Sequence, residues 1–389
     1  MPCINLFFIK MDNYTPNVTK NAYRGCFFFG GELMADLEYN VSKILEEMEL
    51  ELVKAYKKAM GKMKEDEPAK QWRELQLMNM QDYKKHNKQI INHYMRLVNK
   101  EVVKGIREAY QAGEIEVAER LERRTEQYFL NDVDNRKLNA LLNAVHNDME
   151  NVKQAALRQI NDVYRSNIFK TMVWFDSGTL TLKQAIDKAS EEFLAKGLDC
   201  IQYRDGRHVD ICSYSEMALR TNSHRAKVMG ESDQAAEFGI HTCYVSSHGI
   251  TCEMCAPWQG LWLEDDVYNK SKSKIDSGYP KLSEAIESGL FHPNCRHSLI
   301  YGDPNGEKPR RQERTEEDKQ KYKDEQEQRA REREIRKCKR ELNGLQDPSA
   351  IASKKNELKE LQADMRDFLK DKDYLIRRYD RESSATTRK

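Results

Sequence analysis

Hydrophobic residues recur every three or four positions through the N-terminal half of the chain, which predicts long amphipathic helices. This pattern extends from residue 34 to 177, and no glycine or proline occurs between Glu114 and Ser177. Such stripes normally pack against other helices and do not form cofactor sites. The two clearest stripes consist of Leu37, Val41, Ile44, Leu45, Met48, Leu52 and Tyr56, and of Leu138, Leu141, Leu142, Val145, Met149, Val152, Ala156, Ile160 and Val163. We therefore expect a helical N-terminal region over residues 34–177.

Residues 178–305 show a different pattern, in which short alternating segments typical of strands lie between helical ones. Thr181 can cap a helix that Gly197 ends, and "SYSE" at residues 213–216 is a capping box that would open a second helix. Asp205-Gly206 between two alternating runs predicts a β-hairpin with a two-residue turn. Three further strands are expected at "IHTCYVSS", "GLWLEDD" and "HSLIYG". The block is therefore expected to form a small α+β domain.

The region from residue 306 to 389 is highly charged, with both signs interleaved in "QERTEEDKQKYKDEQEQRAREREIRKCKREL". Narrow apolar stripes occur on both sides of a break at Asn343-Gly344 and Asp347-Pro348, and the latter pair is typical of a helix start. We expect an antiparallel helical hairpin followed by a disordered end, "RESSATTRK". The predicted fold is thus mainly α, with a small α+β domain between two helical regions.

Residues 1–33 show no clear periodicity of either kind. The codons for Gly30-Gly31-Glu32 can spell a bacterial ribosome-binding sequence, and Leu33 then supplies the spacer before Met34. One interpretation is that Met34 is the true start and that residues 1–33 are leader. The alternative is a genuine disordered tail, and the codons at Gly30-Gly31 in the gene distinguish the two.

Composition narrows the range of functions. The 389 residues are 33% charged, with a formal net charge of +1, which does not resemble the strongly basic surface of a nucleic-acid-binding domain. No apolar run approaches the roughly 20 residues that a membrane span requires. The nine cysteines are scattered along the chain, which indicates a reducing compartment and not a disulfide framework. Ordinary thiols are expected at Cys3, Cys26, Cys200, Cys212, Cys243 and Cys338.

The remaining cysteines combine with histidines in a pattern typical of metal sites. Cys252 and Cys255 are separated by two residues, and "HPNCRH" supplies His292, Cys295 and His297. Four such donors suit tetrahedral zinc, with Zn–S distances of about 2.3 Å. We predict Cys252, Cys255 and Cys295 as thiolate ligands, with His292 favoured over His297 as the fourth. A closed site of this kind would be structural; the alternatives are buried, reduced residues without metal, or a redox pair.

Several of these segments together resemble the minor capsid protein 2 family of tailed phages. The resemblance covers residues 34 to about 385 and is carried, in order, by "KLNALLNAVHNDMENVKQAALRQINDVYRSNIF", "DGRHVDICSYSEMALRTNSHRA", "CEMCAPWQG", "YPKLSEAIESGLFHPNCRHS" and "YLIRRYDRE". The Cys/His segments also look like the C-terminal part of Mu-type head-morphogenesis proteins. The resemblance implies a virion protein, made in the host cytoplasm, that associates with the portal or capsid interior and supports head morphogenesis.

The partners implied by the resemblance are the portal and major capsid proteins, with at most incidental contact with packaged DNA. We expect no enzymatic activity, no membrane partner and no small-molecule substrate. The competing hypothesis is a metal-dependent nuclease that uses the Cys/His cluster. His241, His248, His292 and His297 are its candidate bases or ligands, whereas Glu264, Asp265 and Asp266 are expected to form a solvated strand end. No His-Glu-x-x-His helix and no phosphate-binding Gly-x-x-x-x-Gly-Lys-Ser/Thr loop occur in the sequence.

Overall fold

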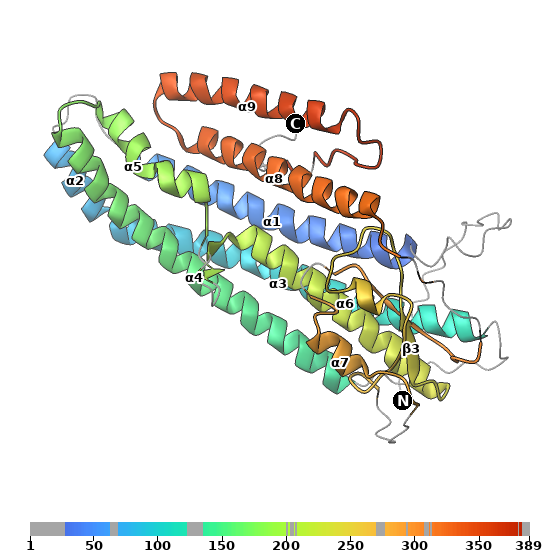
Figure 1. Ribbon diagram of the computed structural model, residues 1–389. Coiled ribbons are helices and arrows are strands. Elements are labelled where there is room, and N and C mark those ends of the chain that lie inside the picture. The colour runs from blue at the N-terminus through green and yellow to red at the C-terminus, as the bar shows by residue number, and fades with distance from the viewer. Residues whose placement is uncertain are drawn as a thin grey trace, which may run out of the picture.

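The computed structural model describes residues 28–62, 69–122, 135–199, 201–202, 206, 208–269, 277–292, 295–306, 311, 313–379 and 381–382. Long helices dominate it (Figure 1). The N-terminal helices are α1 (Phe28–Met60), α2 (Ala69–Met78), α3 (Met80–Glu122) and α4 (Asn135–Asp176). The others are α5 (Leu182–Lys196), α6 (Ile211–Glu237), α7 (Leu282–Glu287), α8 (Glu316–Gly344) and α9 (Pro348–Leu369). Residues 1–27 of the predicted leader lie outside the described residues.

Helices α1, α3, α4 and α6 lie alongside one another and form the body of the molecule (Figure 1). The predicted stripes face inward: in α1, Val41, Leu45, Met48 and Leu52 are completely buried. In α4 the stripe is buried or, at Leu142 and Val163, packed against the core. The helical N-terminal region and its packing are therefore confirmed. Among the described residues, no helix is long and apolar enough to span a bilayer.

Local capping residues fix the entry to α5 and α6. Thr181 caps α5 in a reciprocal capping box with Gln184, and Gly197 ends the helix with φ of 70°, both as expected. The capping box predicted at residues 213–216 is wrong, because α6 already begins at Ile211. Its N-cap is Asp210, whose carboxylate accepts a hydrogen bond from the Ser213 amide at 2.9 Å. A carboxylate three residues earlier satisfies the free amides of the first turn, so the serine is not needed as a cap.

Two small antiparallel sheets occupy the middle of the chain. In the predicted hairpin, β1 (Ile201–Gln202) pairs with β2 (His208–Val209). Gln202 lies opposite His208, so the hairpin is confirmed. The turn predicted at Asp205-Gly206 includes Asp205, which lies outside the described residues. The other sheet has the order β4-β3-β5, formed by Trp262–Glu264, Thr242–Val245 and Leu299–Tyr301. These are the three strands expected from alternation, and the mainly α fold with a small α+β region is confirmed.

The apolar core has two parts, and α3 and α6 contribute to both. The larger part fills the bundle and extends along the chain to Ala226. The smaller part combines the three-stranded sheet and α7 with the last turns of α3 and α6, through Val117, Leu121 and Val228. The small sheet therefore packs on the ends of two bundle helices, and its core is not independent of them.

The C-terminal hairpin forms as expected, with α8 and α9 packed against each other and α8 against α1 and α5. Arg340 attaches it to the bundle: its guanidinium donates to the backbone oxygens of Leu194 and Ala195 and pairs with Glu49 at 3.1 Å. The start of α9 is held by Asp187, which accepts from the amides of Gln346 and Asp347.

The expectation of a disordered end from residue 381 is wrong for Glu382, which is 1% exposed and pairs with Arg377 at 2.6 Å. The side chain of Lys339 in α8 also donates to the backbone oxygen of Glu382. This charge compensation holds a polar segment in place that composition alone would leave free. Residues 383–389 lie outside the described residues.

Candidate metal centre

Two turns bring the predicted thiol and imidazole groups to one place. Cys252 and Cys255 lie between β3 and β4, where the Ala256 amide donates to the Cys252 oxygen at 3.1 Å and a short 3₁₀ turn follows. His292 and Cys295 lie between α7 and β5, and the Cys295 amide donates to the His292 oxygen at 2.9 Å. Each turn places side chains three residues apart on the same side. Because β3 pairs with both β4 and β5, the two turns meet at one end of the sheet.

The donor atoms form two groups that share Cys255. One contains Cys252, Cys255 and His292, the other Cys255, Cys295 and His297, and within each group the atoms lie within 4.8 Å of one another. Cys252 Sγ is 3.0 Å from His292 Nε2, and Cys255 Sγ is 3.6 Å from Cys295 Sγ. Two sulfurs bound to one tetrahedral zinc are separated by about 3.8 Å, given Zn–S bonds of about 2.3 Å. The sulfur spacing therefore fits a shared metal ion.

The two facing thiols have opposite pKa shifts. The contact with Cys295, together with burial, raises the pKa of Cys255. The contact with Cys255 lowers the pKa of Cys295, which favours its thiolate. A thiolate is the form of cysteine that binds metal.

His297 is fixed in one orientation by Gln259. The Gln259 Oε1 atom accepts from the His248 amide at 2.7 Å and lies 3.1 Å from His297 Nε2. Since this oxygen can only accept, Nε2 carries a proton, and Nδ1 is the ring nitrogen left to face Cys295. Nδ1 lies 3.4 Å from Cys295 Sγ. Two electron-rich atoms at this distance require a proton or a cation between them, and an oriented imidazole of this kind is typical of metal-bound histidine.

Two further imidazoles lie beside the cluster, and burial lowers the pKa of both. His248 stacks on His297 with ring centroids 4.2 Å apart, and burial together with His297 lowers the pKa of His248 to about 4. His224 of α6 contacts the His297 backbone oxygen through Nε2 at 2.7 Å, and burial lowers its pKa as well. Neither Gln259 nor His224 was predicted to belong to the site. The proximity of Gln259 to Cys255 was the one available signal, whereas His224 is brought in only by the fold.

The acidic residues at the end of β4 accept hydrogen bonds from neighbouring segments. They were predicted to be exposed to solvent, and this prediction is wrong for Asp265. Asp265 is 3% exposed and accepts from the hydroxyls of Ser232 and Tyr301, both at 2.7 Å. Glu264 accepts from Ser277, and Asp266 accepts from the Ser283 amide in the first turn of α7. Within the described part of the chain, none of the three belongs to a group able to hold a metal ion.

The chain is similar in sequence to known phage proteins. The family model described as phage minor capsid protein 2 matches residues 32–370. The chain is 24% identical over 245 residues to a curated protein of Lactococcus phage LL-H named "Structural protein", a match that covers 61% of this chain and 64% of that protein. The chain thus spans less than two thirds of that relative. No solved structure gives a significant match.

Proposed function

Because the chain belongs to the phage minor capsid protein 2 family, we propose that it is a minor component of a tailed-phage head that supports head morphogenesis. A structural role in the phage agrees with the family and with the name of the curated relative. The observation that carries the finer proposal is the family match, since it extends over the bundle, the Cys/His region and most of the C-terminal hairpin. The proposed partners are the portal and major capsid proteins, and the proposed location is the virion, reached from the host cytoplasm.

Features of the structure support a docking role. The C-terminal hairpin lies along the bundle as a separate layer, with α9 on the outside (Figure 1). Among its described residues, α9 has one fully buried hydrophobic side chain, Met365. Its surface is charged and solvated. An element that adds so little to the core of its own protein is well suited to contacts with other subunits of an assembly.

The test of this proposal is the protein content of particles. Quantitative mass spectrometry of purified mature heads, empty heads and tails should detect the protein in heads at a few copies per particle. A protein found in infected cells but not in particles would contradict the proposal. Cross-linking within heads would then test the portal and the major capsid protein as neighbours.

The Cys/His cluster is proposed to bind one structural zinc ion through Cys252, Cys255, Cys295 and one histidine. Both His292 and His297 lie close enough to the cysteines to bind the same ion. Substitution of each histidine in turn identifies the fourth ligand. His292→Ala and His297→Ala should be compared by zinc stoichiometry and by competition with a chromogenic chelator. Replacement of the true ligand should lower the protein's affinity for zinc by a factor of about 10–100 or more. Even residues that only hydrogen-bond to a metal ligand have effects of that size.

The nuclease hypothesis finds little support in this geometry, because the nearby carboxylates are used as structural acceptors. Incubation of the purified protein with plasmid DNA and Mg²⁺ or Mn²⁺ tests it directly. Cleavage that disappears in both His292→Ala and His297→Ala would overturn the proposed non-enzymatic role.

A further inference from the structure

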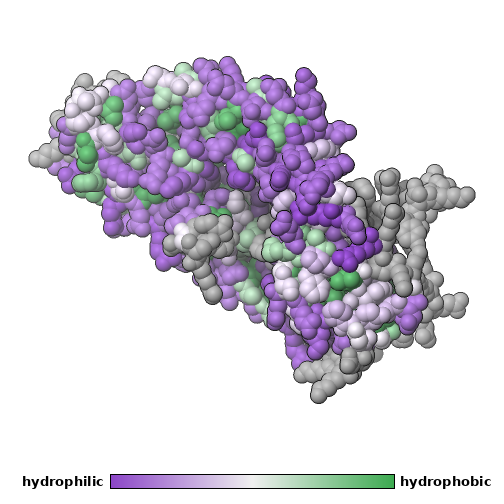
Figure 2. All heavy atoms as spheres, in the orientation of Figure 1, coloured by the Kyte–Doolittle hydropathy of each residue, from purple (hydrophilic) through white to green (hydrophobic). Residues whose placement is uncertain are grey.

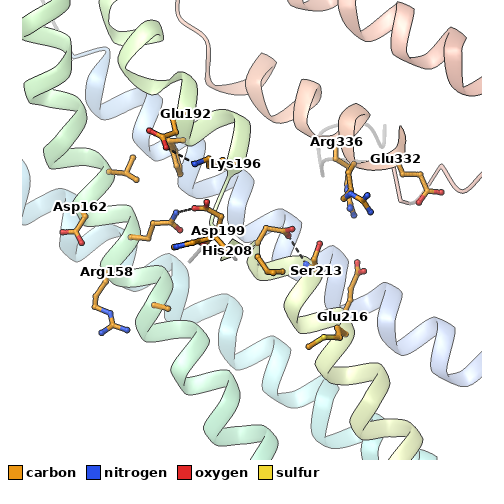
Figure 3. Close-up of a pocket in the computed structure, with 18 of the residues that line it drawn as sticks. Arg158, Asp162, Glu192, Lys196, Asp199, His208, Ser213, Glu216, Glu332 and Arg336 are labelled. Atoms are coloured by element: carbon orange, nitrogen blue, oxygen red, sulfur yellow. Dashed lines mark hydrogen bonds and ion pairs between the residues drawn. The ribbon is translucent and has the colours of Figure 1, made fainter. Parts of the chain in front are cut away.

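The α8–α9 hairpin is separated from much of the bundle by space that side chains do not fill. A polar groove of about 1690 Å³ lies between α8 and the side of the bundle formed by α4, α5 and α6 (Figure 3). A smaller cavity of about 220 Å³ lies between α8 and α1. Hydrophilic side chains predominate on this face of the molecule (Figure 2). Because protein interiors contain few voids larger than a water molecule, the hairpin is not packed on the bundle as a core element would be.

The apolar core of the protein does not extend into the hairpin. Among the described residues, neither of the two apolar clusters contains a side chain of α8 or α9. The buried hydrophobic residues of α8 are Ile335 and Cys338, and the Cys338 thiol donates to the Lys354 backbone oxygen in α9. An interface without a large hydrophobic core is typical of domains that move relative to one another.

Most buried polar side chains of α8 are bonded within the C-terminal region itself. These buried polar residues are Asp324, Gln328, Glu332, Lys339 and Glu341. Gln328 donates to the Ile376 backbone oxygen at 2.8 Å, and Glu341 pairs with Lys354 at 2.7 Å. Asp324 and Lys339 likewise bond to the segment that follows α9. These bonds do not involve the bundle, so separation of the hairpin from the bundle would leave them intact.

The turn between α8 and α9 is bonded directly to the bundle. Asp187 of α5 accepts from the amides of Gln346 and Asp347, both at 2.8 Å, and Arg340 pairs with Glu49 of α1 at 3.1 Å. Both acids are buried, with Asp187 8% and Glu49 9% exposed. We refer to these bonds as the turn contact. Since charged partners in a buried site make strong hydrogen bonds, the turn contact holds this end of the hairpin on the bundle.

The start of α8 is attached to a different part of the molecule. Glu325 pairs with Arg296 of the Cys/His region at 3.0 Å, and the Arg296 side chain is 51% exposed. The groove lies between this pair and the turn contact, along the α8 residues Arg329, Glu332, Arg333 and Arg336. The two ends of α8 are therefore attached to two different regions, with unfilled space between them.

We propose that α8, α9 and the segment up to Glu382 form an arm that detaches from the bundle as one folded unit when the turn contact opens. The arm then pivots about the start of α8. Detachment exposes little apolar surface, because the groove walls are polar and the apolar clusters lie elsewhere. Use of the arm to contact other subunits of a phage head rests on the proposed function, whereas the detachment itself does not.

Hydrogen exchange of the full chain measures opening of the turn contact. The amides of Gln346 and Asp347 donate to the Asp187 carboxylate, so they exchange when this contact opens. Arg340→Gln removes the charge that pairs with Glu49, and it should speed exchange at these two amides at least tenfold. Amides of residues 328–336 in the middle of α8 should keep their protection, because the arm stays folded.

Gly344→Ala opens the same contact without removing a charge. A Cβ atom on Gly344 would lie 2.2 Å from Leu194 Cδ2, and Leu194 is completely buried in α5. Alanine is a better helix former than glycine, so the substitution does not weaken α8 itself. We expect about tenfold faster exchange at Gln346 and Asp347.

The matched control is Arg331→Gln, since Arg331 pairs with Asp364 and Glu327 inside the hairpin. It should leave exchange at the turn unchanged. Movement of the whole arm is measured as the distance between spin labels attached through unnatural amino acids at Glu191 of α5 and Lys359 of α9, both exposed. Arg340→Gln and Gly344→Ala should add a population with longer distances.

The proposal is overturned if both variants leave the label distances unchanged, or if Arg331→Gln speeds exchange at the turn as much as Arg340→Gln does. It is also overturned if the amides of α8 or α3 lose protection together with those of the turn, because the hairpin would then not separate as a folded unit. Since these measurements use neither particles nor metal, their failure is distinguishable from absence of the protein from heads and from absence of zinc.

Discussion

The helical bundle and the Cys/His region are stabilised in different ways. The bundle buries large side chains completely, among them Trp72, Tyr56, Tyr110 and Tyr164. The Cys/His region has strands of three or four residues, and part of its core comes from the ends of α3 and α6. A sheet this small buries too little apolar surface to be stable alone. The difference shows that long helices can supply part of the core of a neighbouring region. The proposed zinc ion would supply the remainder.

The largest effect is expected from replacing Cys255, the ligand that both donor groups share. This substitution should affect the Cys/His region and leave the bundle intact. Cys255→Ser should abolish zinc binding and unfold the three-stranded sheet, while the bundle stays helical. Structural zinc in small domains contributes on the order of 10 kcal/mol of folding free energy. Metal analysis and hydrogen exchange of β3 and β5 measure the effect. Cys243→Ser, in the same core but outside the donor groups, is the control. Unchanged exchange in metal-free Cys255→Ser protein would show that the sheet needs no metal.

A substitution in the bundle core is expected to destabilise the bundle and leave the metal site intact. Ile91 is completely buried in α3, and Ile91→Ala should lower the free energy of unfolding by about 2–5 kcal/mol through lost burial and the cavity that remains. Zinc content should not change. Denaturant unfolding followed by far-UV circular dichroism, with metal analysis of the folded protein, measures both quantities. Loss of zinc in this variant would mean that the two regions are not separable.

A pH effect is expected where the two cores meet. Glu231 of α6 is 1% exposed, and burial raises its pKa to about 7 although Lys227 lies 3.2 Å away. Lys227 is also paired with Glu116 at 2.7 Å, and Arg120 is the other nearby cation. The native state therefore retains a proton that the unfolded chain releases above a pKa near 4.5. This contribution to stability is complete below that value and is lost as the pH rises through about 7.

The difference amounts to about 2 kcal/mol between about pH 5 and pH 8. Glu231→Gln should remove this part of the pH dependence, which is obtained by comparing urea unfolding of the two proteins at each pH. Because the cysteines and histidines titrate equally in both proteins, their contributions cancel. An identical pH dependence in the variant would contradict the assignment.

The smallest expected effect concerns the close contact of α3 with α6. A Cβ atom on Gly230 would lie 2.1 Å from the Tyr110 backbone oxygen, so Gly230→Ala forces the two helices apart. We expect a net loss of about 1–2 kcal/mol, since alanine recovers up to ~1 kcal/mol through helix propensity. Thermal unfolding should show that both regions lose stability, because both use these helices. Ser353→Ala on the exposed face of α9 should be neutral, and equal behaviour of the two variants would argue against a tight crossing.

The helices were predictable because their apolar stripes are long and regular. Thr181 and Gly197 were likewise assigned correctly, since a cap is a local interaction. Errors occurred where a nearby group competed: Asp210 replaced Ser213 as the cap of α6. Burial of Asp265 and Glu382 was missed because it depends on partners far along the chain, Ser232 and Tyr301 in one case and Lys339 in the other.

The sequence by itself determined the helical class, the positions of the strands and the set of thiols and imidazoles, because these follow from periodicity and short spacings. Only the tertiary structure decided that Gln259 and His224 contact His297, and that the small sheet completes its core with α3 and α6. The reason is that burial and electrostatic interaction depend on distance in space, and residues separated by 70 or more positions are brought together by packing alone.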